Sequence, residues 1–392
     1  MKDQGTGQPS LLAGGLLNRL LGRLGLLAGD DLPGLSAALL FITLAWTVPA
    51  MLCVVGGTAW DVAAGERSFL LDPAVHVRFG VAILLLVMLE RGAEQRVTAL
   101  FGHFTASGLI PPAALPVYRA ALRRAARHSA HAAAEYAALV LAFIISFASV
   151  GLGVATLGSS WMGRLVDGGM VLSPAGWWSL LVSFPLFWFL VLRWLWRFIV
   201  GARLLRELSR ASLQLLPTHP DGCAGLGFLG QFPATFSPLA FAMSCVAAAT
   251  AFKAIVYENL GMKFIVAFLL TWLALVALTL IGPLAAFASP LRRTRRDALL
   301  DYGVLLAQHN RAFEHKWIKR ERAGGELLGA GDVSSMADFA AVYDQVRSVR
   351  LLPVDRRTLV SVMVVCSLPW LPVFATLMPL VDVLKMMAKA FL

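Results

Sequence analysis

The sequence predicts an all-α fold, a polytopic bundle of about seven transmembrane helices with a cytoplasmic N-terminus. Of its 392 residues, 58% are hydrophobic and only 15% are charged, which is too little charge to cover a water-facing surface. Several apolar runs also reach the roughly 20 residues that a helix needs to cross the hydrocarbon core. The charged residues that remain collect between these runs, as a multi-pass topology requires.

The first segment, residues 1–34, precedes the apolar runs and contains "LLNRLLGRLGLL". Its leucines are interrupted by Arg19 and Arg23, so the segment is not a signal peptide. Arginines four residues apart among leucines favour an amphipathic helix that lies in the membrane interface.

Residues 35–290 form the predicted bundle. We expect spans at 35–55, 70–89, 136–157, 177–200, 236–256 and 264–287. The second span depends on an apolar run, 79–89, that is only 11 residues long between Arg78 and Glu90. It crosses if upstream residues extend it and its charged ends snorkel to the interface, and otherwise the chain has six spans.

Two water-facing segments separate or follow these spans. We expect a cytoplasmic helical segment at 91–134 and a larger one at 291–357, where "RAGGELLGAGDVSS" separates one or two helices. Residues 358–392 then supply the last span and a C-terminal amphipathic helix.

The distribution of Lys and Arg sets the orientation. With seven spans and a cytoplasmic N-terminus, 27 of the 34 Lys and Arg residues fall on the cytoplasmic side. The opposite orientation would invert this bias, so the positive-inside rule supports the assignment. The net charge of +11 therefore indicates topology and attraction to anionic lipid headgroups, and we expect no nucleic-acid partner.

Arg193 and Arg197, in "LRWLWRFIVGARLLRELSR", lie four residues apart on one face of the fourth predicted span. Ionisable residues within a membrane are costly, which makes them candidates for a functional role such as an anion path or a lipid-phosphate site. The alternative is a helix end with snorkelling arginines beside tryptophans, and we favour it because the charge bias already predicts it. We find no acidic residue in the middle of a span, so a proton- or sodium-coupled mechanism lacks its usual carboxylate.

The stretch "RHSAHAAAEY" offers weak metal ligands. His128, His131 and Glu135 have the i, i+3, i+7 spacing of one helical face just before the third span. The stretch lacks the glutamate of an HExxH site, and no fourth ligand can be named. We favour a polar helix end and expect neither a metal site nor a cofactor.

The loop "LLPTHPDGCAGLGFL" follows the basic helix. Its prolines end that helix and Asp221-Gly222 favours a tight turn, while "LGFLGQF" predicts a re-entrant segment. A turn does not require the pairing of His219 with Asp221. These two residues either cap the local backbone or line a cavity together with Arg193 and Arg197, and we favour capping.

Three motifs in order, "DPAVHVRFGVAILLLVMLE", "LRWLWRFIVGARLLRELSR" and "THPDGCAGLGFLG", resemble a family of uncharacterised bacterial multi-pass inner-membrane proteins. The resemblance covers residues 72–230 and implies a bacterial plasma-membrane location but no chemistry. In that family the histidine loop continues with two consecutive glycines, and Ala224 stands in place of the first.

The function stays open between two main hypotheses. Prolines in most spans permit kinks around a cavity, so we place first a channel or transporter for a small solute, with anions among the candidates. The alternative is a non-transporting scaffold or sensor that binds a partner or anionic lipid through "LRRTRRD" and "EHKWIKRER". An enzyme is the weakest hypothesis, because no nucleophile or phosphate-binding motif is present.

A water-accessible path between spans four and five would favour transport, whereas a closed, dry bundle would favour the scaffold. The expected partners are the bilayer and anionic headgroups, and a homo-oligomer is left open.

Overall fold

The computed structural model describes residues 14–26, 34–60, 68–157, 160–166, 169–258, 261–319 and 331–376. Within these ranges, seven helical segments are long and apolar enough to cross a membrane. They are Leu35–Val55, Pro73–Ala106, Pro112–Ser149, Pro174–Leu208, Gly227–Val256, Met262–Ile318 and Arg356–Ala375. The all-α class and the count of seven are confirmed, and the chain is a multi-pass integral membrane protein. The run 79–89 belongs to a long helical segment and is not too short to cross.

Parts of three predicted elements lie outside the described residues. They are most of the segment 1–34, most of the linker "RAGGELLGAGDVSS", and the C-terminal amphipathic helix. The described part of the first segment holds the short helix α1 (Leu16–Arg23).

The first two spans are interrupted helices. The first consists of α2 (Leu35–Ile42), the π-helical turn η1 (Thr43–Thr47) and α3 (Val48–Val55). The second consists of α4 (Pro73–Val75), the π-helical η2 (His76–Ala82), α5 (Ile83–Met88) and α6 (Glu90–Ala106). The turn η1 ends two residues before Pro49, whose missing N–H and bulky ring disrupt the regular α-helical ladder.

The third and fourth spans enclose a small hairpin. After η3 (Pro112–Ala114) come α7 (Leu115–Ser129) and α8 (Ala132–Leu157), and then the antiparallel strands β1 (Gly163–Val166) and β2 (Gly169–Leu172). The fourth span is built from α9 (Pro174–Trp178), the π-helical η4 (Ser179–Ser183) and α10 (Phe184–Leu208). As in the first span, this π turn ends two residues before a proline, Pro185.

The last three spans carry the projecting part of the molecule. The fifth is η5 (Gly227–Gly230) with α11 (Gln231–Glu258). The sixth, α12 (Met262–Ile281), continues through a 3-10 turn, η6 (Gly282–Phe287), into α13 (Ala288–Phe313) and η7 (Glu314–Ile318). After α14 (Gly331–Arg347), the seventh span is α15 (Arg356–Ser367), η8 (Leu368–Trp370) and α16 (Leu371–Ala375).

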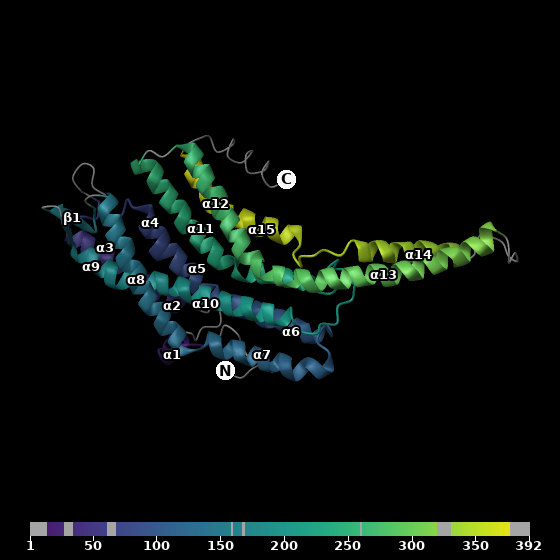
Figure 1. Ribbon diagram of the computed structural model, residues 1–392. Helices are drawn as coiled ribbons and strands as arrows, with labels where there is room; N and C mark the ends of the chain where they lie inside the picture. The colour runs from purple at the N-terminus through teal and green to yellow at the C-terminus, as the bar shows by residue number, and fades with distance from the viewer. Residues whose placement is uncertain are drawn as a thin grey trace.

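The two ends of the bundle bear different elements (Figure 1). The end that bears β1, β2 and α9 is called the hairpin side, and the end that bears α6, α7 and the start of α13 is called the basic side. From the basic side, α13 and α14 project as a two-helix arm, and α13 with η7 extends about 45 Å at 1.5 Å per residue. At the far end of the arm, Asp332 pairs with Lys316 and accepts a 3.0 Å hydrogen bond from the indole N–H of Trp317.

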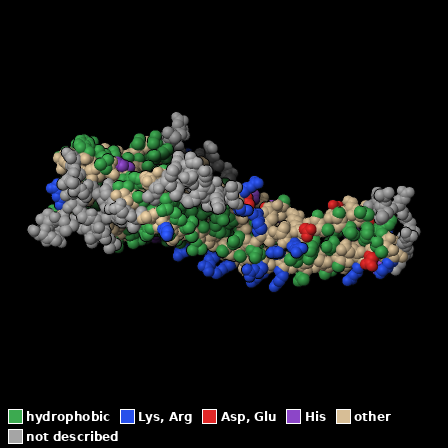
Figure 2. Space-filling view, turned by 90° about the horizontal axis from the view of Figure 1, so that it is seen from above, with side chains coloured by type: hydrophobic (Ala, Val, Ile, Leu, Met, Phe, Trp, Pro, Cys, Tyr) green, Lys and Arg blue, Asp and Glu red, His purple; other side chains and the backbone are tan. Residues whose placement is uncertain are grey.

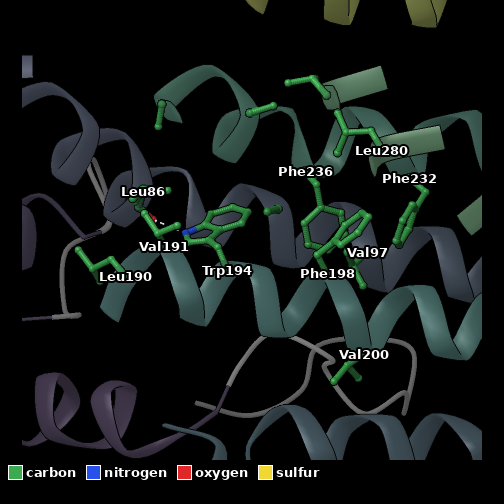
Figure 3. Packing of buried hydrophobic residues seen from close by; sticks show 14 of the residues in the cluster. Leu86, Val97, Leu190, Val191, Trp194, Phe198, Val200, Phe232, Phe236 and Leu280 are labelled. Carbon is green, nitrogen blue, oxygen red and sulfur yellow. Dashed lines mark hydrogen bonds between the residues drawn. The ribbon is translucent and has the colours of Figure 1, made fainter. Parts of the chain in front are cut away.

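The space between the fourth and fifth spans is filled by aromatic side chains (Figure 3). Phe236 of α11 contacts Trp194 and Phe198 of α10 edge-on, with ring centroids 6.2 and 5.1 Å apart. The indole N–H of Trp194 donates a 2.9 Å hydrogen bond to the carbonyl of Leu86, so its polar atom is satisfied in the core. Trp194 and Phe236 are almost fully buried, so these two rings pack in the core of the bundle.

Candidate functional site

The most highly charged buried cluster lies where four helices meet on the basic half of the bundle. Arg193 and Arg197 of α10 are each only 3% exposed, and both face Glu90 at the start of α6. The two guanidinium nitrogens Nη1 and Nη2 of Arg193 donate to the two carboxylate oxygens of Glu90 at 2.7 and 3.0 Å. Nε of Arg193 donates to Glu135 of α8 at 3.3 Å, and Nη2 also donates to Oδ1 of Asn18 at 2.8 Å. The fork of Arg193 therefore joins α1, α6, α8 and α10.

Arg197 completes the charge balance without a full set of hydrogen bonds. Its Nη1 lies 2.7 Å from Oε1 of Glu90, as an ion pair. Neither Nη1 nor Nη2 of Arg197 makes a well-aligned hydrogen bond within the described part of the chain. Two arginines face two carboxylates, so the cluster has no net formal charge.

Glu135 also holds the N-terminal helix in place. Its Oε2 accepts hydrogen bonds from the backbone N–H groups of Leu16 and Leu17, the first two residues of α1. These groups have no partner within a helix, and a carboxylate at a helix N-terminus is stabilising. Gly15 makes the approach feasible, because a Cβ at this position would lie 2.0 Å from Oε1 of Glu135.

The weak metal ligands of the sequence are not brought together. The prediction that His128, His131 and Glu135 share one face of a single helix is wrong, because α7 ends at Ser129 and a new helix, α8, begins at Ala132. His131 starts the new helix, since its Nδ1 accepts from the backbone N–H of Ala133 at 3.2 Å. Glu135 instead faces Arg193, and among the described residues there is no group of three or more His, Cys, Asp or Glu side chains that could hold a metal ion.

His219 and Asp221 form a local cap. Oδ1 of Asp221 accepts from the backbone N–H groups of Cys223 at 2.8 Å and Gly225 at 3.1 Å, and Oδ2 accepts from Gly227 at 2.7 Å. Nδ1 of His219 lies 3.0 Å from Oδ1 of Asp221. This is the capping arrangement that the sequence favours, and within the described residues no ion pair or hydrogen bond joins the pair to Arg193 or Arg197.

The cap changes the acidity of the carboxyl group. Burial raises the pKa of Asp221, but the hydrogen bonds from Cys223, Gly227, Gly225 and His219 outweigh it. The pKa of Asp221 therefore lies below its ordinary value. The loop keeps a fixed negative charge near neutral pH.

The loop is also clamped to the base of the arm. Arg350 donates from its backbone N–H to the carbonyl of Gly222 and from Nη2 to the carbonyl of Asp221, both at 2.8 Å. Gln345 at the end of α14 donates to the carbonyl of Thr218 at 2.8 Å. The "LGFLGQF" stretch is not a separate re-entrant segment, because η5 leads directly into α11 and belongs to the fifth span.

Comparisons with models of protein families, with curated proteins and with solved structures gave no match to this chain. The resemblance of residues 72–230 to bacterial inner-membrane proteins therefore stays a prediction.

Sequence reasoning placed Arg193 and Arg197 on one face but missed their main partner. The sequence predicts Glu90 as the charged end of a short span, whereas Glu90 lies inside the segment Pro73–Ala106 and its side chain is only 16% exposed. A usable signal existed, since charged residues within membrane spans commonly pair with one another, which makes a carboxylate on another helix the expected partner. Hydropathy alone gives no means of finding which helix supplies it.

Proposed function

We propose that this membrane protein is a non-transporting scaffold or sensor that binds anionic lipid headgroups at its cytoplasmic face, the basic side. The observation that carries the proposal is a contrast between two sets of arginines. Arg193 and Arg197 inside the bundle are neutralised by carboxylates, whereas eight arginines of the basic side are exposed and lack such partners among the described residues.

The interior supports a closed bundle. The cluster around Arg193 has no net formal charge to attract an anion, and its hydrogen bonds are directed at neighbouring helices. The rings of Trp194, Phe198 and Phe236 contact one another between spans four and five, where a solute path would run. These features favour a structural role for Arg193 and Arg197 over a role in lining an anion path.

The surface supports lipid binding. Eight exposed arginines have no described carboxylate within ion-pair distance; this basic surface consists of Arg119, Arg123, Arg127, Arg203, Arg206, Arg210, Arg292 and Arg293. Seven of them lie in α7, α10 and α13, and Arg210 lies in the turn that follows α10. Lys and Arg side chains gather near the middle of the molecule in Figure 2. Each basic residue close to an anionic leaflet contributes about 1 kcal/mol of attraction.

Two measurements test the proposal. Liposomes that contain the protein are expected to pass chloride, phosphate and small organic anions no faster than protein-free liposomes. The thermal stability of the purified protein is expected to rise more with phosphatidylglycerol than with phosphatidylcholine, and the difference is expected to shrink at high salt. Arg164→Gln, which removes an exposed charge from the hairpin side, serves as the control and leaves the lipid preference unchanged. Protein-dependent anion flux would overturn the proposal in favour of a channel or transporter, and equal stabilisation by the two lipids would also overturn it.

A further inference from the structure

One part of the basic surface is continuous with an apolar crevice. Arg203 and Arg206 line a hollow of about 410 Å³ between the end of α10 and η6. A second cavity, of about 160 Å³, lies between α10, α11 and α12, and all its lining residues except Thr279 are hydrophobic. Phe198 lines both cavities, which together are called the groove.

The two cavities follow the same helices in the same direction. Along α10 the apolar crevice begins at Val191 and the hollow ends at Arg206. On the facing element, the crevice is lined from Trp272 to Leu280 of α12, and the hollow is lined by residues 282, 283 and 286 of η6. The groove is thus apolar at one end and basic at the other, which is the polarity of a phospholipid.

The length of the groove fits one leaflet. From Val191 to Arg206 an α-helix rises about 22 Å at 1.5 Å per residue. Half of the hydrocarbon core is about 15 Å thick, and the headgroup region adds several ångströms. The crevice also opens sideways to the bilayer, since Leu195 and Leu275 on its walls are 37% and 53% exposed.

The charge of the hollow favours an anion. No acidic residue within the described part of the chain lines it, and the carboxylate next in sequence, Glu207, is paired with Arg124. Arg203 and Arg206 are therefore free of a described carboxylate partner and can bind phosphate oxygens through their guanidinium groups.

We propose that the groove binds one anionic phospholipid, with its phosphate between Arg203 and Arg206 and an acyl chain along the crevice. The proposal rests on the proposed function and adds a defined site to it. The neighbouring residues Arg292 and Arg293 belong to the basic surface but do not line the groove.

Native mass spectrometry of the full chain in detergent tests the site, with phosphatidylglycerol, phosphatidylcholine and inorganic phosphate as the probes. We expect one tightly bound phosphatidylglycerol, and a loss of about thirtyfold in its affinity in the Arg203→Gln/Arg206→Gln variant. The Arg203→Lys/Arg206→Lys variant keeps the charge and is expected to retain most of the affinity. The matched control Arg292→Gln/Arg293→Gln removes the same charge and is expected to change the affinity less than twofold.

A second variant tests the shape of the site without changing charge. Gly282 lines the hollow, has right-handed helical backbone angles, and has open space where a Cβ would stand. Gly282→Phe is therefore expected to fold, with an unchanged melting temperature without added lipid, and to lose the tightly bound phosphatidylglycerol.

The outcomes distinguish a failure of the groove as a lipid site from a failure of the proposed function. Equal losses in the Arg203/Arg206 and Arg292/Arg293 variants would overturn the site and leave general anionic-lipid binding intact. Inorganic phosphate that displaces phosphatidylglycerol at equal concentration would show a free-anion site and overturn the lipid assignment. Wild-type protein without any preference for phosphatidylglycerol over phosphatidylcholine would instead refute the proposed function itself.

Discussion

Nη1 of Arg193 lies 2.7 Å from Oε2 of Glu90, although the two residues are 103 positions apart in the chain. The pair joins the fourth span to the second at a depth where the Arg193 side chain is only 3% exposed. A buried ion pair is weak support for stability in itself, because desolvation offsets much of the attraction. Removal of one partner is costly, however, since it leaves the other charge buried and uncompensated.

Glu90→Gln is therefore expected to lower the free energy of unfolding by about 3–5 kcal/mol, because Arg193 and Arg197 would then share a single carboxylate, Glu135. Unfolding in mixed detergent with increasing dodecyl sulfate measures the change. Glu207→Gln breaks an ion pair whose two side chains are 47% and 49% exposed, and it is expected to cost less than about 1 kcal/mol. A loss at Glu90 no larger than that at Glu207 would show that the buried cluster does not hold the helices together.

The attachment of α1 to the bundle depends on the absence of a side chain at Gly15. Gly15→Ala is expected to displace the Glu135 carboxylate and release α1, so that amide hydrogen exchange in residues 16–23 becomes faster. Gly25→Ala is the matched control, because Gly25 also has a positive φ but has nothing within 4 Å of the added Cβ. Both variants place an alanine at a positive φ, which costs about 1–3 kcal/mol, and only the first disturbs Glu135. Equal exchange rates in the two variants would contradict the role of the contact.

The span count could be predicted from sequence because it depends on local hydropathy. The sequence predicts the first span at residues 35–55, and the structure has it at Leu35–Val55. For the charged cluster, the sequence predicts the two arginines but not the carboxylate that they share. The spacing of Arg193 and Arg197 places both on one face of a helix, but their partner Glu90 is set by packing between spans. Next to Arg91 at the end of an apolar run, Glu90 has the same local pattern as a solvated helix end.

The loop around Asp221, at the base of the arm, is likewise predictable only in its local contacts. Pro217 and Pro220 predict that the basic helix stops before the loop, and the local chemistry of Asp221 predicts its hydrogen bonds to nearby backbone. Nothing in that stretch indicates that Arg350, 129 positions away, donates to the carbonyl of Asp221. Such a contact follows from the fold of the whole chain.

Replacement of Asp221 tests the cap through its pH dependence. The pKa of Asp221 is lowered in the folded protein, so the stabilisation that it provides is full above its unfolded pKa of about 3.9 and is lost as the pH falls through the folded value. Asp221→Asn is expected to lower stability at neutral pH by about 1–3 kcal/mol and to flatten the decline below pH 4. Thermal melts from pH 7 to pH 3 measure both effects. Asp297→Asn, in an exposed pair with Arg296, is the control and should leave the acid dependence unchanged.

Ala224 is the one residue other than glycine with a positive φ among the described residues, at 54°. This left-handed conformation costs an L-residue about 1–2 kcal/mol, and glycine avoids most of that cost. Ala224→Gly also removes a buried methyl group and raises the entropy of the unfolded chain, and both effects oppose the relief of strain, so the expected net gain in stability is at most about 1 kcal/mol. Ala211→Gly, in an exposed loop position with ordinary φ, is expected to lose about 0.4–1 kcal/mol. Opposite signs for the two substitutions, measured by thermal or denaturant unfolding, would show that the loop strains its backbone at Ala224. A loss at Ala224 as large as at Ala211 would mean that the packing of its methyl group outweighs the strain.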